Sequence, residues 1–354
     1  MNTAAGTGHL RVEVVPYALP FKRTYRAAPG ALERRELVLL RLTDRNGVTG
    51  LGEGVPLSLR GGADTGAVVG ALERWAATAA VDGPPTLPDG PAPARCAVAT
   101  ALADLEAKIE GVPLHALLGG APNRSEIRCN AAIGADSVDD VAAQAESLAA
   151  AGFRRFKLKV GVPGDRERLV ALREAIGPEG MVRLDANGSW TPEHAISFIE
   201  AVGTQGIELL EQPAPDLVGL AQVRAGQAVP VVADESVSTP EEASEAERLE
   251  ACDAVTIKIS KVGGLDGSLG GFLPTYISSA LDGPVGIAAA GHLAATLPEQ
   301  GPTGAVFHGL ATLPLFDGTI ASSGPELDGD RLILPPGPGC GVEIDESALE
   351  RYRL

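Results

Sequence analysis

Lysine, aromatic residues and cysteine are all scarce in this sequence of 354 residues. Only six of its 29 basic residues are lysine, so arginine is its usual cation. Two tryptophans, four tyrosines and seven phenylalanines leave the core to be built mainly from aliphatic side chains. The four cysteines are widely separated and form no CxxC pair, which predicts reduced thiols and excludes a dense disulfide framework.

The sequence also lacks an excess of positive charge and a long uninterrupted apolar run. Its formal net charge of −17 argues against binding to nucleic acid or to an anionic membrane surface, because both need a basic face. The most apolar long window, 277–298, contains Asp282 and His292 and does not qualify as a membrane span. The first residues show no signal-peptide pattern. We therefore expect a cytoplasmic protein whose partner is a small molecule.

The order of the predicted elements divides the chain into three parts. Residues 1–122 read as antiparallel strands followed by helices, an α+β module with a hairpin turn at 44–47. In 123–320, short apolar strands alternate with helices, and 321–354 is turn-rich and is predicted to pack back on the first module. The middle part contains eight predicted strands, in IRCNAAIG, FRRFKLKVG, MVRLDANG, GIELLEQPA, VPVVADES, AVTIKIS, TYISSAL and AVFHGLA.

Eight strands with intervening helices predict a closed parallel barrel of the (β/α)8 type. The alternative is an open doubly wound sheet, but no GxGxxG follows a predicted strand. Only 13 residues separate Gly264 from Ser278, so the helix after the sixth strand is predicted to be truncated. The basic segment 21–30 is predicted to be a loop, either a mobile lid or an exposed hairpin.

Charged residues recur at nearly constant intervals along the predicted barrel. Lys159, Asp185, Glu211, Asp234 and Lys258 are separated by 26, 26, 23 and 24 positions. One strand–helix unit of a barrel takes roughly 30 residues, since eight units need about 250. Each of the five therefore falls near the carboxyl end of a successive strand, where barrel active sites are built. The spacing predicts that all five project into one pocket.

Three converging carboxylates would repel one another unless a cation joined them. Oxygen ligands without cysteine or histidine favour a hard divalent ion, Mg²⁺ first and Mn²⁺ as the alternative. In a strand, Lys157 and Lys159 face the same side, so both are expected to point into the barrel. Each ammonium, together with a nearby metal ion, should lower the pKa of the other and make one amine a usable base, a role that arginine cannot fill.

These segments resemble the enolase superfamily in its muconate-lactonizing branch. The matching motifs are KLK (157–159), DANGSW (185–190), EQP (211–213), ADES (233–236) and KISKVGG (258–264). The resemblance covers nearly the whole chain, including the α+β module before the barrel. It implies a modified (β/α)7β barrel with an N-terminal capping domain, and a reaction that removes a proton α to a carboxylate.

By this resemblance the three acidic residues are the metal ligands, and Lys159 and Lys258 are the acid/base pair, supported by Lys157. Asn187 and Glu235 are implied to be polar residues of the pocket or of its immediate surroundings. Ser278 and Ser279 are further candidates for binding a substrate carboxylate. Lys261 is expected to face the helix layer or solvent. The family's barrels often associate, so a homo-oligomer is also an expectation.

The segments 276–298 and 308–318 are similar to those of ortho-succinylbenzoate synthases of menaquinone biosynthesis. This resemblance implies a lyase in which Lys159 removes the proton, hydroxide is eliminated, and Lys258 lies against the ring face. N-acylamino acid racemase and muconate cycloisomerase remain alternatives, because they share the metal and the lysines. Dipeptide epimerases rank lower, since Asp317 is the only acidic residue near the last barrel strand. A different class of enzyme, with a Schiff-base lysine and no metal, is disfavoured by the three carboxylates.

Overall fold

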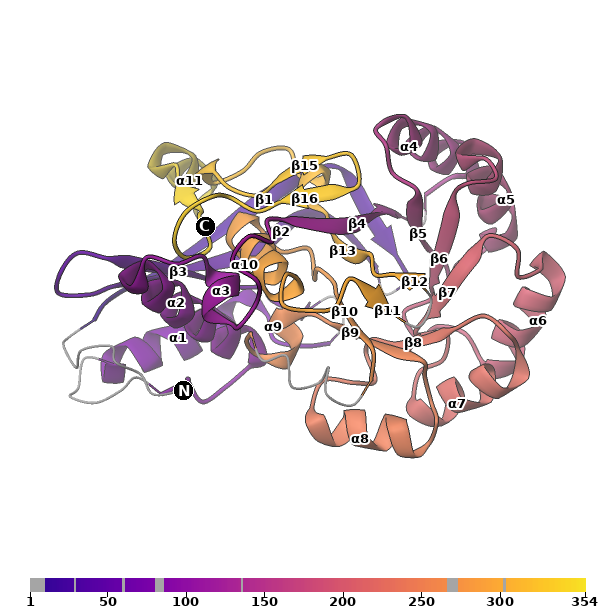
Figure 1. Ribbon diagram of the computed structural model, residues 1–354, viewed down its shortest axis with the longest axis horizontal. Coiled ribbons are helices and arrows are strands. Elements are labelled where there is room, and N and C mark those ends of the chain that lie inside the picture. Colours follow the sequence, from indigo (N-terminus) through magenta and orange to yellow (C-terminus); the bar gives the residue numbers. More distant parts are fainter. Residues whose placement is uncertain are drawn as a thin grey trace.

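The structure is a computed structural model that describes residues 10–28, 30–58, 61–79, 86–134, 136–265, 273–301 and 304–354. Its first part is an antiparallel sheet of β1 (Arg11–Ala27), β2 (Gly30–Thr43) and β3 (Thr49–Gly54). Helices α1 (Thr65–Ala79) and α2 (Ala92–Glu110) cover one face of this sheet, as Figure 1 shows. The predicted α+β module is confirmed, together with its turn between β2 and β3.

Glycines in β3 allow the sheet to approach α2 closely. A Cβ atom at Gly50 would lie 2.1 Å from the carbonyl oxygen of Ala101, and one at Gly52 would lie 1.9 Å from that of Ala97. Any side chain at either position would therefore push the helix away from the strand. The contact buries a separate hydrophobic cluster that includes Leu40, Leu72 and Val98.

The segment 21–30 is not a loop. Its first seven residues continue β1, and β2 already begins at Gly30; Pro29 lies outside the described residues. Tyr25 pairs with Leu32 across the two strands, and the ring of Phe21 stacks on that of Tyr25 at 5.7 Å. Of the two alternatives for this segment, the structure has the exposed hairpin, and these aromatic contacts support its extended strands despite the basic residues.

Eight parallel strands form the barrel that the sequence predicts. The sheet order runs from β10 back through β4, β13 pairs with β4, and a bridge between Ser278 and Gly309 joins the two ends. The strands are β4 (Glu126–Ile133), β5 (Arg155–Lys159), β6 (Met181–Asp185), β7 (Ile207–Glu211), β8 (Val231–Ala233), β9 (Ala254–Ile257), β10 (Thr275–Ile277) and β13 (His308–Ala311).

Helices surround the outside of the barrel (Figure 1). Several begin with side-chain caps, such as Ser137 before α4 and the capping box of Thr239 and Glu242 at α8. The full-length barrel helices are α4 (Val138–Ala150), α5 (Asp165–Ile176), α6 (Pro192–Val202), α7 (Leu217–Gly226), α8 (Pro240–Arg248) and α10 (Pro284–Ala294). After β9 comes only a four-residue helix, α9 (Ile259–Val262), which agrees with the predicted truncation; residues 266–272 lie outside the described part.

The C-terminal segment contacts both the barrel and the first module. Strand β16 (Arg331–Ile333) pairs antiparallel with β4, and the backbone nitrogen of Leu354 donates to the carbonyl of Pro16 in β1. The remaining short elements of the chain are α3 (Leu114–Leu117), β11 (Gln300–Gly301), β12 (Gly304–Ala305), the 3-10 helix η3 (Leu313–Leu315), β14 (Ala321–Ser323), β15 (Glu326–Asp328), β17 (Glu343–Ile344) and α11 (Glu346–Tyr352).

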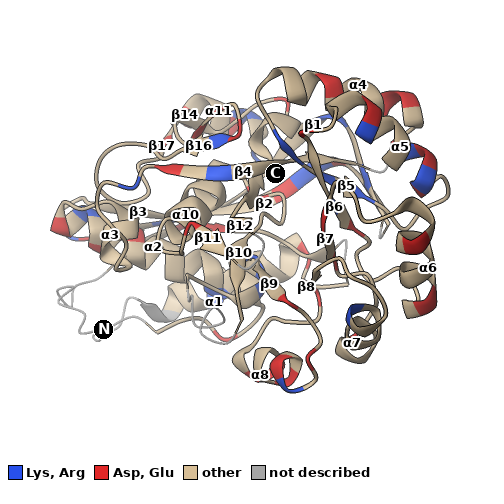
Figure 2. Ribbon diagram, turned by 45° about the vertical axis from the view of Figure 1, so that its right-hand side comes forward, with Lys and Arg blue, Asp and Glu red and all other residues tan. Residues whose placement is uncertain are grey.

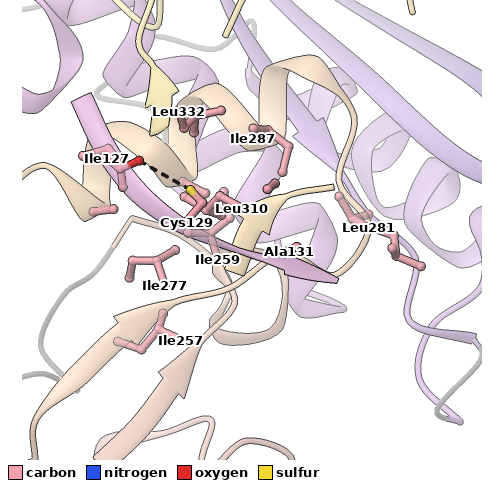
Figure 3. Close-up of a cluster of buried hydrophobic side chains, with 14 of the residues drawn as sticks. Ile127, Cys129, Ala131, Ile257, Ile259, Ile277, Leu281, Ile287, Leu310 and Leu332 are labelled. Atoms are coloured by element: carbon pink, nitrogen blue, oxygen red, sulfur yellow. Dashed lines mark hydrogen bonds between the residues drawn. The ribbon is translucent and has the colours of Figure 1, made fainter. Parts of the chain in front are cut away.

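One hydrophobic core extends through the barrel and below the first sheet. Figure 3 shows part of it, where Ile127 and Cys129 of β4 lie among side chains such as Ile277, Leu310 and Leu332. The Cys129 thiol donates to the Ile127 carbonyl oxygen at 3.6 Å. All four cysteines are described, and all are buried and free.

Charged residues lie mainly on the outer helices and loops, as Figure 2 shows for α4 to α8. Those on the barrel strands are the exceptions, and several of them are fully buried. Within the described ranges, no helix is both long and apolar enough to span a membrane.

Candidate active site

Six charged side chains meet at the carboxyl ends of β5 to β9 and form what we call the strand-end cluster. In the β5–β6–β7 register, Lys159 is level with Asp185, which is level with Glu211. Asp234 and Lys258 directly follow β8 and β9. The sixth member is Lys157, two positions before Lys159. The three carboxylic acids have 0% exposed surface and the lysines at most 7%, so the predicted convergence is observed.

Cations and anions are paired one against another in the strand-end cluster. Lys157 Nζ lies 2.6 Å from Glu211 Oε2 and 2.8 Å from Asp185 Oδ2. Lys159 Nζ lies 2.5 Å from Asp185 Oδ2, and Lys258 Nζ donates to Asp234 Oδ2. Three ammonium groups are thus paired with three carboxylates in a largely buried cluster.

Burial by itself lowers the pKa of the Lys157 ammonium, but the charges of Asp185 and Glu211 hold that pKa well above its ordinary value. Burial likewise raises the pKa of Asp185, yet the ammonium groups of Lys157 and Lys159 bring it below its usual range. The pKa of Glu211 is raised by burial and by the charge of Asp185. The net shift of the Lys157 pKa is therefore upward, against the effect expected from a neighbouring ammonium, because two carboxylates lie within 2.8 Å of its amine.

The cluster fits a hard divalent cation in its chemistry but not in its present side-chain positions. Within the described ranges, no three acidic, histidine or cysteine side chains surround one point at metal-binding distances. The lysine ammonium groups lie between the carboxylates instead. The Glu211 Oε1 atom is buried and accepts no hydrogen bond from the described residues, while Tyr276 donates to Oε2 at 2.7 Å. A buried carboxylate oxygen without a donor is what a metal ligand offers.

The strand-end cluster lies beneath a cavity of about 270 Å³. The three lysines form part of its lining, and the carboxylates lie below them. The first module contributes Tyr25, Leu32 and Arg35, whereas Ile133 and Leu281 come from the barrel. The pocket therefore combines a charged floor with largely apolar walls, as a site for a small organic acid requires.

Glu235 lines this pocket, and Asn187, which is not part of the lining, links it to Lys159 in one hydrogen-bonded chain. Lys159 Nζ donates to Asn187 Oδ1 at 3.0 Å, and Asn187 Nδ2 donates to Glu235 Oε1 at 3.0 Å. Asn187 has a φ of +47°, a left-handed conformation that asparagine tolerates better than most residues. The chain orients the Lys159 amine relative to β6.

The sequence analysis did not identify Gln212, although it falls within the EQP motif. Gln212 has a φ of +39° and is fully buried. Its Oε1 atom accepts from the backbone nitrogen of Asp234 at 2.8 Å, and its Nε2 atom donates to Ser236 Oγ at 2.5 Å. Gln212 thereby ties the end of β7 to the end of β8 and supports the Asp234 backbone.

Lys261 does not face the helix layer or solvent as predicted. It lines the pocket, its amine donates to the Asp234 carbonyl and, at 2.8 Å, to that of Val237, and it lies 3.6 Å from Asp234 Oδ1. The reason is the short α9, which turns back the chain directly after Lys258. The sequence predicts that this helix is truncated, but it does not show that the truncation turns Lys261 toward the pocket.

Ser278 and Ser279 both line the pocket, as the sequence analysis proposed. Ser279 also accepts hydrogen bonds from the backbone nitrogens of Leu281 and Asp282, both at 2.9 Å, so it shapes its own loop. Arg35, a buried residue of β2 that also lines the pocket, was missed because the basic sequence around it resembles that of an exposed strand. His308 lies at the start of β13, at the opposite end of the barrel, where its Nδ1 atom accepts from the backbone of Ile277.

Comparison with known proteins identifies relatives over the full length. A family model described as "Enolase C-terminal domain-like" matches residues 140–348. Muconate cycloisomerase 1 of Rhodococcus opacus is 30% identical over 96% of this chain and 97% of that relative. The L-Ala-D/L-Glu epimerase of Bacillus subtilis is 30% identical over 94% of this chain and 96% of that relative.

The solved structures agree with this result. The dipeptide epimerase of Enterococcus faecalis V583, complexed with Mg and the dipeptide L-Leu-L-Tyr, superimposes with a TM-score of 0.87. It is 26% identical in sequence, and the match covers 95% of this chain and 99% of that structure. The fold, a barrel preceded by a capping module, is thus shared with enzymes that catalyse isomerisation.

Proposed function

This chain belongs to the muconate-lactonizing branch of the enolase superfamily, and we propose that it removes a proton α to a substrate carboxylate with the help of a divalent cation. The strand-end cluster is the observation that carries the proposal. Lysines from β5 and from the end of β9 flank three buried carboxylates below a pocket of suitable size. Mg²⁺ is the proposed cation, because it prefers carboxylate oxygens and is present in a related epimerase.

Asp185, Glu211 and Asp234 are the proposed metal ligands. When bound, the cation would neutralise negative charge that develops on the substrate carboxylate. The lysines that neutralise these acids in the metal-free arrangement would then be released toward the pocket. The orphaned Glu211 Oε1 atom supports this assignment, since it already lacks a donor among the described residues.

Lys159 is the proposed base. As a free amine it takes the α-proton, and the electron pair of the broken C–H bond moves into the carboxylate to give an enediolate. Asn187 holds the amine in place through its 3.0 Å hydrogen bond. Lys258 approaches from the strand on the other side of the carboxylates, and Lys157 remains the charged neighbour that stabilises the cluster.

Formation of ortho-succinylbenzoate by dehydration is the first proposed reaction. After proton removal, the electron pair of the enediolate forms a carbon–carbon double bond, while the bond from the β-carbon to the hydroxyl group breaks and its electron pair leaves with hydroxide. The departing hydroxide then accepts the proton from the Lys159 ammonium, which releases water and restores the amine. The similarity of segments 276–298 and 308–318 to ortho-succinylbenzoate synthases supports this choice.

Muconate cycloisomerisation is the second candidate, and the 30% identity to muconate cycloisomerase 1 supports it. Racemisation of N-acylamino acids would use the same lysines on opposite faces. Dipeptide epimerisation ranks lower, although relatives catalyse it. Within the described lining of the pocket, Glu235 is the one carboxylate, and it accepts a hydrogen bond from Asn187, so a substrate ammonium has little to bind.

Direct assay decides between these reactions. The purified chain with Mg²⁺ would be tested against the dehydration precursor of ortho-succinylbenzoate, muconate, N-acylamino acids and dipeptides. We expect turnover of one of the first three, loss of activity in excess chelator, and recovery on addition of Mg²⁺. Full activity in chelator, with borohydride trapping of a carbonyl substrate, would instead favour a Schiff-base lysine.

The domain boundaries and assembly are also proposals. We propose residues 1–122 as the capping domain, 123–320 as the catalytic barrel and 321–354 as the segment that packs back on the cap. A homo-oligomer is proposed from the family resemblance. Light scattering of the purified chain would test it, and a monomer at micromolar concentration would exclude it.

A further inference from the structure

A second buried cluster of ionisable groups joins the first module to the barrel next to the pocket; we call Tyr17, Arg35, Glu53 and Asp282 the junction cluster. Glu53 belongs to β3 and is 2% exposed. Its Oε1 atom accepts from the backbone nitrogen of Gly283 at 2.6 Å, and its Oε2 atom accepts from the Tyr17 hydroxyl at 2.8 Å. The hydrogen bond between Gly283 and Glu53 connects residues that are 230 positions apart in the sequence.

Glu53 acts as the N-terminal cap of α10 from a different part of the fold. Gly283 is the N-cap residue of this helix and provides no side-chain cap of its own. The Glu53 carboxylate satisfies its backbone N–H and lies at the positive end of the helix dipole. A Cβ atom at Gly283 would lie 2.4 Å from the Tyr17 hydroxyl, so no larger residue fits there without movement.

The segment 278–281, which forms one wall of the pocket, is fixed immediately before this helix. Arg35 donates to the carbonyl oxygens of Ala280 at 3.0 Å and Leu281 at 3.3 Å. Asp282 Oδ2 accepts from the Ser279 hydroxyl at 2.8 Å. Leu281 has a φ of +67°, an unfavourable conformation for a leucine, so the wall needs these contacts to keep its shape.

We propose that Glu53, which lies behind the pocket wall and touches no reacting group, is a positioning residue that sets the shape of the wall through Gly283 and α10. This inference rests on the proposed function only in taking the pocket as the substrate site. Glu53 belongs to the capping module, so the module controls the wall from outside the barrel. Loss of Glu53 weakens substrate binding and leaves the chemistry at Lys159 intact.

The junction cluster makes the wall sensitive to pH. The groups that face Glu53 are Tyr17 from β1, Asp282 from the wall, the Cys96 thiol from α2 and, beyond Asp282, Arg35 from β2. Burial first, and then the charge of Asp282, raises the pKa of Glu53 from 4.5 to about 7. A Cβ atom at Gly286 would lie 2.8 Å from Glu53 Oε1 and 3.0 Å from Asp282 Oδ1, which places both carboxyl groups around one point.

The direction of the pH dependence follows from the difference in proton affinity of Glu53 between the closed and the opened wall. Glu53 binds its proton more tightly in the closed junction than in the opened state. The junction is therefore most stable below the ordinary pKa of a glutamic acid, and this stabilisation is lost as the pH rises toward 7. The wall therefore opens more often at pH 7.5 than at pH 5. For a single proton and this interval, the opening equilibrium increases by at least roughly tenfold.

Hydrogen exchange on the full-length chain tests the proposal without any substrate. The amides of Ala280 to Gly283, corrected for intrinsic exchange rates, should lose at least about tenfold protection between pH 5 and pH 7.5 in the wild type. Glu53→Gln keeps the shape of the cap and should reduce this pH dependence, leaving only the part that comes from Asp282, whose pKa is also raised by burial. The matched control is Glu33→Ala, at an exposed position of β2. An identical pH dependence in the wild type and Glu53→Gln would overturn the proposal.

Steady-state kinetics on the substrate that the wild type turns over then separate positioning from folding. Glu53→Ala should raise KM about tenfold or more and change kcat less than about threefold, because uniform binding is lost. Glu53→Gln should restore KM at pH 5 to 6. An unchanged KM in Glu53→Ala, or a failure of Glu53→Gln to restore it, contradicts the proposal. A wild type without activity on any substrate would refute the proposed function and leave the exchange result to decide this inference.

Discussion

The strand-end cluster and the junction cluster are both buried and both charged, yet they are built in opposite ways. In the first, three lysines neutralise three carboxylates, and the pKa of Asp185 falls. In the second, Glu53 and Asp282 face each other while Arg35 is engaged by backbone carbonyls, and the pKa values of both acids rise. Removing the Asp185 carboxylate should therefore destabilise the first cluster, whereas removing the Glu53 carboxylate should relieve the second.

The largest expected effect concerns catalysis. Lys159→Ala should lower kcat/KM by about 10³-fold, the usual contribution of a positioned base. Lys159→Arg should fail similarly, since a guanidinium does not release its proton. The control is Lys22→Ala, at an exposed position of β1. If Lys159→Ala keeps more than about a tenth of the wild-type activity, this amine is not the base.

The next effect concerns stability of the metal-free chain. Asp185→Asn leaves Lys157 and Lys159 without their shared carboxylate, which should reduce the free energy of unfolding by about 3 kcal/mol. The folded pKa of Asp185 is lowered, so its contribution is present above the unfolded pKa of an aspartic acid and is lost as the pH falls through the folded value. The free energy of unfolding in urea, measured for both chains at pH 7 and at pH 3, would test both expectations. If the wild type and Asp185→Asn were equally stable at pH 7, the ion pairs of Asp185 with Lys157 and Lys159 would not stabilise the chain.

The junction cluster should respond with the opposite sign. Glu53→Gln removes a buried negative charge that faces Asp282, and it should stabilise the chain at pH 8 by on the order of 1 kcal/mol. At pH 5 the wild-type carboxyl group is already protonated, so the two chains should be equally stable. Urea unfolding at both pH values tests the difference, and destabilisation at pH 8 would mean that Glu53 acts there as a favourable anion.

The two clusters also differ in how far the sequence predicts them. The strand-end cluster follows from intervals of 23 to 26 residues, because each barrel strand repeats the same unit. The eight strands were predicted for the same reason. Glu53 and Asp282 come from different modules and share no repeat, so only their three-dimensional packing brings them together. Lys261 was placed wrongly because the predicted truncation of the helix after β9 does not by itself give the direction of this side chain.

The chemistry of the strand-end cluster was harder to predict than its position. Spacing indicated that lysines and carboxylates converge, but not which atoms would pair. Each ammonium lies next to a carboxylate, and the pKa of Lys157 is raised rather than lowered. The segment 21–30 shows the same limit, since its charge suggested a loop while aromatic stacking keeps it in a strand.

The smallest expected effect belongs to an exposed ion pair that also joins distant parts of the chain. Arg41 Nη2 of β2 lies 2.7 Å from Glu346 Oε1 of α11, but the Glu346 side chain is 70% exposed. Water screens this pair and both side chains lose freedom on forming it, so Glu346→Gln should change the free energy of unfolding by less than about 0.5 kcal/mol. Urea unfolding in low and high salt measures it. A decrease in the free energy of unfolding of more than about 1.5 kcal/mol that disappears in high salt would contradict this. It would show that an exposed ion pair can stabilise this molecule as much as a buried one.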